Sequence, residues 1–329
     1  MDEPVNPVME REWKPIRSLL ILFCMCILVS GLIVYVTLWK TPANFPIQSI
    51  VTIESGQGLQ HIVRDFKDKS IIRSPLLFRS IVIVLGGEKR VVAGDYLLDK
   101  RDNPLTLALR IIGGDFHMPE VKLTIPEGLS AQEISQILKD NLISFDTTLF
   151  IEQAQKYEGY LFPDTYFFRP TAKPEDVVRR MNNLYQKKIS QLEDDIAKSG
   201  YTTKDIITMA SILEGEAKTT EHRKIVAGIL WKRMSAGVPL QVDATFKYIN
   251  GKTTEQLSLD DLKIDSRYNT YVYKGLPPTP INSPGIDAIN SALNPTKTAY
   301  WYFLTGKDGT MHYAKTFEEH KANKAKYLR

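Results

Sequence analysis

The protein has 329 residues, of which 43% are hydrophobic and 24% charged, and its formal net charge is +4 at pH 7. A chain of this composition can bury a core, so an intrinsically disordered protein is excluded. The net charge is small, and no stripe of basic residues is interleaved with aromatic ones, which argues against a nucleic-acid-binding protein. The length predicts about two domains.

The first predicted element is a transmembrane helix over residues 18–39, a segment without any charged residue. As an α-helix it would be about 33 Å long, enough to cross the hydrocarbon core of a bilayer. Trp13, Tyr35 and Trp39 lie near its two ends, where aromatic side chains favour the membrane interface. A cleaved signal peptide is the alternative, but the apolar segment is too long and no small-x-small cleavage site follows it.

Basic residues indicate the orientation of this helix. Arg11, Lys14 and Arg17 precede it, whereas only Lys40 follows it closely. The positive-inside rule therefore makes residues 1–17 a cytoplasmic tail and places the rest of the chain outside the cytoplasmic (inner) membrane, in the periplasm. We expect a single-pass protein with an exported catalytic part.

Cysteine and histidine give no sign of a disulfide framework or a metal site. Both cysteines, Cys24 and Cys26, fall within the predicted membrane helix, so the exported part must be held by its own core. The histidines show no metal-ligand spacing; they are His61, His117, His222, His312 and His320. No P-loop or dinucleotide-binding glycine pattern appears either, and we expect neither a metal nor a cofactor.

A short linker and a small subdomain follow the membrane helix. Residues 40–47 contain two prolines, which disfavour a helix and predict a stiff linker. Residues 48–118 then alternate between strand and helix patterns, which predicts a βααβ subdomain. The expected elements are a strand over Ser49–Glu54, helices over Leu59–Asp68 and Pro75–Leu85, a returning strand over Val91–Leu98, and a helix capped by Asn103.

The sequence also matches itself without gaps at an offset of 72 residues. One interpretation is that a strand-turn-helix unit occurs twice. The other is that any such unit gives similar matches, because strand and helix periodicity force several of them. The matches pair Thr52-Ile53 with Thr124-Ile125, Gly56 with Gly128, Gln60 with Gln132, Ile62 with Ile134, Lys67-Asp68 with Lys139-Asp140, and Ile71 with Ile143.

Residues 119–329 predict a mixed α+β domain. Helices are expected over 174–198, 203–214 and 220–236, a hairpin over 300–314, and a short polar helix at the end. The segment Glu158–Tyr166 is rich in aromatic residues, which could stack on sugar rings. Ordinary core packing is the alternative interpretation, and it is favoured for any single ring.

Glu214 is the leading catalytic candidate, because it closes the apolar helical segment Ile206–Leu213. A carboxyl group on a buried helix is costly to ionise, so its pKa should rise and it should hold a proton near neutral pH. Such a group can serve as a general acid. Glu216 lies two residues further on and should point to nearly the opposite side, toward solvent.

A glycosidase normally needs two carboxyl groups across the scissile bond, and Asp243 is the best second candidate. A single acid suffices if the nucleophile belongs to the substrate. The C6 hydroxyl of muramic acid in peptidoglycan can attack its own C1, and the intramolecular ring closure gains from a high effective molarity. Glu214 would then protonate the leaving oxygen and afterwards accept the hydroxyl proton.

Several motifs in order resemble the MltG (YceG-like) endolytic murein transglycosylases over essentially the whole chain. They are Glu158–Tyr166, Ala210–Glu216, Leu240–Thr245, Tyr268–Tyr271, Gly275–Pro278 and Ser283–Gly285. Where some members of the family have proline, this sequence has Ala244.

The resemblance implies a LysM-like subdomain over residues 48–118 and a catalytic domain over residues 119–329. It implies a carbon–oxygen lyase that cleaves MurNAc–GlcNAc bonds of nascent peptidoglycan strands, leaves 1,6-anhydro-MurNAc ends and so terminates strand elongation. Cell-wall synthases are implied partners. The family's catalytic glutamate falls on Glu214, and the implied cleft residues are Gln241, Asp243, Thr245, Asn269 and Tyr271.

Three functional hypotheses remain open. The first is the membrane-anchored lytic transglycosylase acting through Glu214. The second is a peptidoglycan hydrolase (muramidase) with Glu214 as acid and Asp243 as base, which would leave reducing ends. The third is a non-catalytic glycan-binding scaffold, which the presence of Glu214 disfavours.

Overall fold

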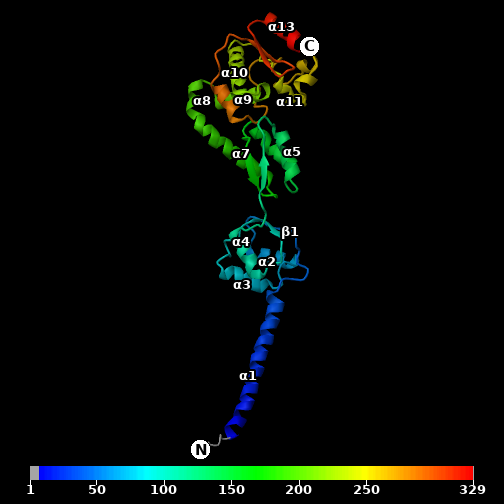
Figure 1. Cartoon of the computed structure of the whole chain (residues 1–329), viewed down its shortest axis with the longest axis vertical. Helices are drawn as coiled ribbons and strands as arrows, with labels where there is room; N and C mark the ends of the chain where they lie inside the picture. Colours follow the sequence, from blue (N-terminus) through cyan, green and yellow to red (C-terminus); the bar gives the residue numbers. More distant parts are fainter. Residues whose placement is uncertain (1–6, 329) are drawn as a thin grey trace, which may run out of the picture. The chain divides into compact units, whose positions relative to one another are not determined.

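The computed structural model describes residues 7–328, without the side chains of residues 7–17, Val34 and Thr37. The chain forms two compact units, one ending at Pro119 and the other starting at Glu120 (Figure 1). Helices and three two-stranded sheets make the fold α+β.

The first unit begins with helix α1 (Pro7–Val34) and a short π-helical turn over Tyr35–Trp39. Over the part of the chain that the structure describes, no helix combines the length and the apolar character needed to cross a membrane. The predicted transmembrane helix therefore stays a prediction. Residues 1–6 of the expected cytoplasmic tail lie outside the described residues, as do the side chains of Arg11, Lys14 and Arg17.

The rest of the first unit has the βααβ order that the sequence predicts. Its elements are β1 (Ser49–Ile53), α2 (Leu59–Asp68), α3 (Pro75–Val84), β2 (Gly94–Leu98) and, after the second strand, α4 (Pro104–Gly113). β1 and β2 pair antiparallel with Ser49 opposite Leu98. Phe66, Phe78 and Tyr96 are at most 1% exposed and lie in the core between the helices and the sheet.

The second unit opens with the same order of elements, which supports the repeat. They are β3 (Val121–Thr124), α5 (Ala131–Asn141), α6 (Thr147–Ala154) and β4 (Thr165–Phe168), with β3 and β4 antiparallel. The first residues of α5 and α6 lie 72 positions after those of α2 and α3. Gly56 and Gly128 have the same left-handed backbone, with φ of 79° and 77°. The sequence match thus reflects two βααβ units.

The remainder of the second unit is mostly helical. Its elements are α7 (Pro174–Ile189), α8 (Glu193–Ser199), α9 (Thr203–Glu216), α10 (Thr220–Ser235), α11 (Ala244–Asn250), α12 (Ile286–Leu293), β5 (Tyr302–Thr305), β6 (Met311–Ala314) and α13 (Phe317–Tyr327). The predicted helix 174–198 is interrupted by a 3-10 turn over Ser190–Leu192. The predicted hairpin is present, as the antiparallel pair β5–β6.

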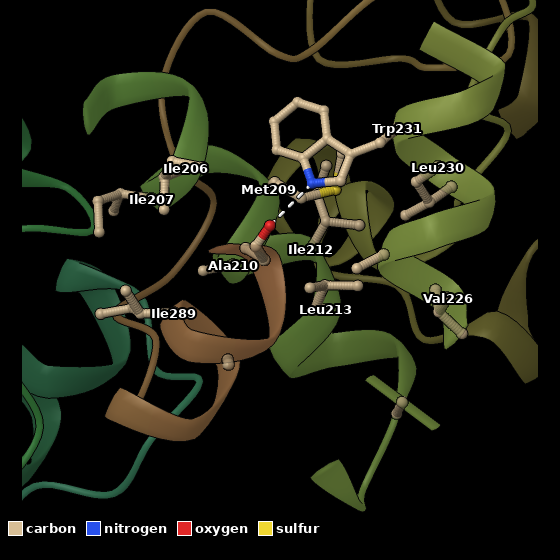
Figure 2. Packing of buried hydrophobic residues seen from close by; sticks show 14 of the residues in the cluster. Ile206, Ile207, Met209, Ala210, Ile212, Leu213, Val226, Leu230, Trp231 and Ile289 are labelled. Atoms are coloured by element: carbon tan, nitrogen blue, oxygen red, sulfur yellow. Dashed lines mark hydrogen bonds between the residues drawn. The ribbon is translucent and has the colours of Figure 1, made fainter. Parts of the chain in front are cut away.

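Helix α9 is the central element of this unit. Thr202 and Asp205 form the capping box at its start, and every residue from Ile206 to Leu213 is at most 1% exposed. A helix buried on all sides is held by neighbours in every direction. Figure 2 shows α9 side chains packed against those of α10, where the Trp231 indole donates a 3.0 Å hydrogen bond to the Ala292 carbonyl of α12. The last turn of α9 is therefore rigidly placed.

Candidate active site

Glu214 lies in the last turn of α9, where the helix leaves the core. Its side chain is 6% exposed. Oε2 accepts a 2.9 Å hydrogen bond from the backbone N–H of Gly285, and Oε1 forms an ion pair with the Arg223 guanidinium. The carboxyl group thus has a defined position with a small accessible surface, as a general acid needs.

Arg223 holds two carboxylates at once. Its second terminal nitrogen lies 2.6 Å from Oδ2 of Asp287, in the first turn of α12. Thr220 donates a 2.8 Å hydrogen bond to the other oxygen of Asp287. Burial alone would raise the pKa of Asp287, but the hydrogen bonds from Arg223 and Thr220 outweigh it and lower this pKa. Asp287 is therefore the ionised partner of Arg223.

The pKa of Glu214 is raised above its ordinary value. Burial is the largest cause, and the negative charges of Glu127 and Asp287 act in the same direction. The Gly285 N–H and the Arg223 charge oppose it, but they do not compensate for the loss of hydration. The direction agrees with the expectation from the sequence, so Glu214 holds its proton to higher pH than an exposed glutamate.

A loop between β3 and α5 lies directly over Glu214. A Cβ on Gly128 would come 3.3 Å from Cγ of Glu214. The φ of Gly128 is 77°, in the left-handed region that favours glycine. Two 2.9 Å backbone hydrogen bonds join the loop to the chain before α12, from Gly128 to Ser283 and from Ser283 to Leu129. Segments far apart in sequence therefore meet at one carboxyl group.

Glu216 is not solvent-facing, contrary to the expectation from the sequence. Helix α9 continues through Gly215 to Glu216, which is half-buried and accepts a 3.1 Å hydrogen bond from the N–H of Ala244. Burial raises the pKa of Glu216 to about 7, and the Asp243 charge adds to this. A Cβ on Gly215 would lie 2.8 Å from Cβ of Ala244, so α11 packs against the end of α9 and covers Glu216.

Asp243 lies with Tyr271 and Glu216. The Tyr271 hydroxyl donates a 2.6 Å hydrogen bond to Oδ1 of Asp243. Burial, followed by the Asp243 charge, raises the pKa of Tyr271. Asp243 also acts on Glu216, whereas the carboxylates that raise the pKa of Glu214 are Glu127 and Asp287. The structure thus joins two of the expected cleft residues, Asp243 and Tyr271.

Gln241 is exposed and has a positive φ of 49°. Its side-chain oxygen accepts a 2.6 Å hydrogen bond from Arg233, and its N–H donates a 3.0 Å bond to the Thr270 carbonyl. These bonds hold a strained turn in place next to Asp243. Gln241 has surface available to a ligand.

Thr245 and Asn269 have no exposed surface, with 0% exposure each. The Thr245 hydroxyl donates to the Val242 carbonyl at 3.0 Å. The Asn269 amide donates to the carbonyls of Leu262 and Ile264 at 3.0 and 2.8 Å, and its oxygen accepts from the Tyr271 N–H at 3.0 Å. Both side chains therefore hold backbone groups within the protein, and neither has surface of its own for a ligand in this structure.

The aromatic segment Glu158–Tyr166 mainly fills the core. Leu161, Phe162 and Tyr166 are at most 5% exposed, which favours the packing interpretation over sugar stacking. Glu158 is also buried and accepts a 3.1 Å hydrogen bond from the Ala131 N–H at the start of α5. Burial raises the pKa of Glu158 to about 7.

Among the described residues, no group of three or more His, Cys, Asp or Glu side chains is arranged to hold a metal ion. The sequence does not predict three residues of the site: Glu127, Arg223 and Asp287. They lie outside the chemical motifs around Glu214 and Asp243, and only the fold brings them to the same place.

Comparison with known proteins identifies the class to which this fold and this site belong. The model of the YceG-like family matches residues 51–326, and the chain belongs to this family. The endolytic murein transglycosylase of Bacillus subtilis (strain 168) is 30% identical over 305 residues, which cover 84% of each chain.

Two further relatives extend this comparison. The endolytic murein transglycosylase of Streptococcus pneumoniae serotype 2 is 29% identical over 320 residues, covering 84% of this chain but 58% of that protein. A crystal structure of a YceG-like protein from Listeria monocytogenes matches with a TM-score of 0.56 and 28% identity, over 84% of this chain and 99% of that one.

Proposed function

We propose that the protein is a membrane-anchored endolytic transglycosylase that cleaves MurNAc–GlcNAc bonds of nascent peptidoglycan strands. The observation that carries this proposal is the Glu214 carboxyl group, which is nearly buried at the end of a rigid helix and has a raised pKa. Membership of a family with relatives named endolytic murein transglycosylase supports the substrate class.

In the proposed reaction, Glu214 donates its proton to the glycosidic oxygen as the bond from this oxygen to C1 of MurNAc breaks. The C6 hydroxyl of the same MurNAc then bonds to C1 and returns its proton to the Glu214 carboxylate. The products are a 1,6-anhydro-MurNAc end and a GlcNAc end, and no water is consumed. The closure is intramolecular, so no external nucleophile has to be positioned.

The surroundings of Glu214 suit both halves of this cycle. Burial favours the protonated form before bond cleavage. After the transfer, the Arg223 guanidinium and the Gly285 N–H stabilise the carboxylate. We assign Arg223 as a positioning residue, since it acts through Glu214 and Asp287.

The other proposed site residues fall into two groups. Gln241, Asp243 and Tyr271 line the proposed glycan cleft, because each has surface to offer to a ligand. Thr245 and Asn269 position the cleft residues from within the protein through their hydrogen bonds to backbone.

We further propose that residues 18–39 anchor the protein in the cytoplasmic membrane and that residues 48–118 form a LysM-like subdomain. The uncharged sequence of residues 18–39 supports the anchor, as does the exposure of its apolar side chains, such as Leu19 at 66% and Leu28 at 72%. The βααβ order supports the subdomain. Such an anchor would keep the site close to emerging strands and to the synthases that make them.

Digestion of uncrosslinked glycan strands by the purified full-length protein, followed by mass spectrometry of the new ends, tests this function. We expect 1,6-anhydro-MurNAc ends from the wild type and none from Glu214→Gln, which preserves the side-chain shape. Reducing MurNAc ends would instead make the protein a hydrolase. Anhydro ends formed by Glu214→Gln at the wild-type rate would refute the assignment of the acid.

A further inference from the structure

A second carboxylate, Glu127, lies beside Glu214. It belongs to the loop between β3 and α5 that covers the proposed acid. A Cβ placed on Gly285 would come 1.8 Å from Oε1 of Glu127, so the Glu127 carboxyl group lies where a side chain at position 285 would be. The N–H of the same glycine donates to Oε2 of Glu214 at 2.9 Å.

These two contacts limit the distance between the carboxyl groups. With ordinary bond lengths within Gly285, an oxygen of Glu127 and Oε2 of Glu214 are at most about 7 Å apart. Carboxyl pairs that act on opposite sides of a glycosidic bond lie about 5 to 9.5 Å apart. The separation of Glu127 and Glu214 is therefore compatible with a sugar ring held between them.

Glu127 also differs from its neighbours in having no partner of its own. Asp287 is paired with Arg223, and Asp243 accepts a hydrogen bond from Tyr271. The Glu127 carboxylate makes no hydrogen bond and no ion pair with any residue that the structure describes. Its side chain is exposed, so this charge is available to a bound molecule.

The repeat shows that this carboxylate is not required by the loop itself. Gly56 in the first βααβ unit corresponds to Gly128, with nearly the same φ of 79° against 77°. The residue before it in the first unit is Ser55, at the position that Glu127 has in the second. The same turn therefore forms without an acid, and the acid occurs in the copy that faces Glu214.

We propose that Glu127 is a second catalytic carboxylate, which contacts the reacting MurNAc ring and stabilises the positive charge that develops at C1. Glycosidic cleavage passes through an oxocarbenium-like state, and a negative charge close to C1 lowers its energy. Glu127 takes no proton in this role and forms no bond. The assignment rests on the proposed function, because it requires the glycosidic bond to be held next to Glu214.

The test compares Glu127→Gln with wild type in the full-length protein. We expect kcat to fall about 100-fold, the effect typical of one lost electrostatic contact to the transition state, while KM changes less than about threefold. Because the neighbouring negative charge is removed, the alkaline limb of the pH–rate profile should also move to lower pH. Glu152→Gln, which removes an exposed carboxylate from α6, is the matched control and should change neither quantity.

An unchanged kcat and an unmoved pH profile in Glu127→Gln would overturn the proposal. So would reducing ends from the wild type that disappear in Glu127→Gln, because Glu127 would then act as a base toward water. The thermal unfolding temperature separates a catalytic from a structural effect, and we expect it to stay at the wild-type value. The ends made by wild type report on the proposed function, whereas the rate ratio of the two proteins reports on Glu127.

Discussion

The N–H of Gly285 donates a hydrogen bond to Glu214, and the missing side chain of the same glycine makes room for Glu127. One residue at the start of α12 therefore arranges two carboxyl groups through two different atoms. The N–H of Gly285 stabilises the ionised form of Glu214. The absence of a Cβ on Gly285 leaves the space that the Glu127 carboxylate occupies.

Gly285→Ala should lower activity without lowering stability much. Its φ of −76° suits alanine, but the new Cβ would collide with the Glu127 carboxylate. This carboxylate is the far end of an exposed side chain, so a change of rotamer can relieve the collision. We expect kcat to fall roughly tenfold or more, as the contact from Glu127 is lost. Kinetics and thermal unfolding measured together check this, and a variant with full activity would contradict it.

Arg223→Gln should raise the pKa of Glu214 further, because it removes the positive charge that lowers this pKa. Activity that depends on protonated Glu214 disappears as the pH rises through the pKa of Glu214. The alkaline limb of the pH–rate profile should therefore move to higher pH. The variant should also be less stable by about 3 kcal/mol, since two carboxylates lose their partner.

Arg223→Lys is the matched control, because it keeps the charge but not the forked geometry. Its alkaline limb should stay near that of wild type even if its maximal rate falls. A limb that moves to lower pH in Arg223→Gln would show that the guanidinium does not act on Glu214 in the assumed direction.

Asp243→Asn should reduce activity by less than Glu214→Gln does. Asp243 lies with Tyr271 and Glu216, so its loss should disturb the cleft rather than remove the acid. Tyr271→Phe removes the same hydrogen bond from the other side and should have a similar effect. Steady-state rates on glycan strands distinguish the cases: a loss in Asp243→Asn as complete as in Glu214→Gln would favour the two-carboxylate hydrolase.

Glu158 should make folding less favourable as the pH rises. Its pKa is about 7 in the folded protein, above the ordinary value of 4.5, so between these two values the unfolded chain releases a proton that the folded protein keeps. Stability should therefore fall by up to roughly 3 kcal/mol over this interval.

Glu158→Gln should flatten this decline, because glutamine can still accept the hydrogen bond from Ala131 but cannot ionise. Part of the slope should remain, since burial raises the pKa of Glu216 to about 7 as well. Urea unfolding at several pH values provides the measurement. A slope identical to that of wild type would exclude Glu158 as its source.

Much of the fold could be predicted from local signals. Helix α9 has a capping box at Thr202 and an apolar run up to Leu213, and both act within the segment itself. The first βααβ unit was predicted for the same reason, from Pro75 at the start of a helix, the cap at Asn103 and the alternation of strand and helix patterns. Glu214 could be recognised because an acidic residue that follows a long apolar segment is either buried or at the end of a helix, and Glu214 is both.

The rest of the site could not be predicted because it depends on contacts between distant segments. Glu127 and Asp287 look like ordinary surface acids in the sequence. The bridge between Leu129 and Ser283 joins their two segments, and hydrogen bonds from Ile281 and Asn282 to Ser211 hold the chain before α12 against α9. Asn269 lies in a polar motif that suggested ligand contact, yet its amide holds two carbonyls inside the protein. For Glu216, helical periodicity alone predicted an exposed side chain, because it takes no account of the α11 segment that covers this residue.

The account as a whole depends on the protonation of Glu214, and a titration tests it most directly. The carboxyl signal that differs between wild type and Glu214→Gln can be followed by infrared difference spectroscopy as the pH is raised. The account predicts that the pKa of this group lies above the ordinary glutamate value of 4.5, because the side chain is buried. Ionisation below that value would contradict it, because the site would then hold no acid to protonate a glycosidic oxygen.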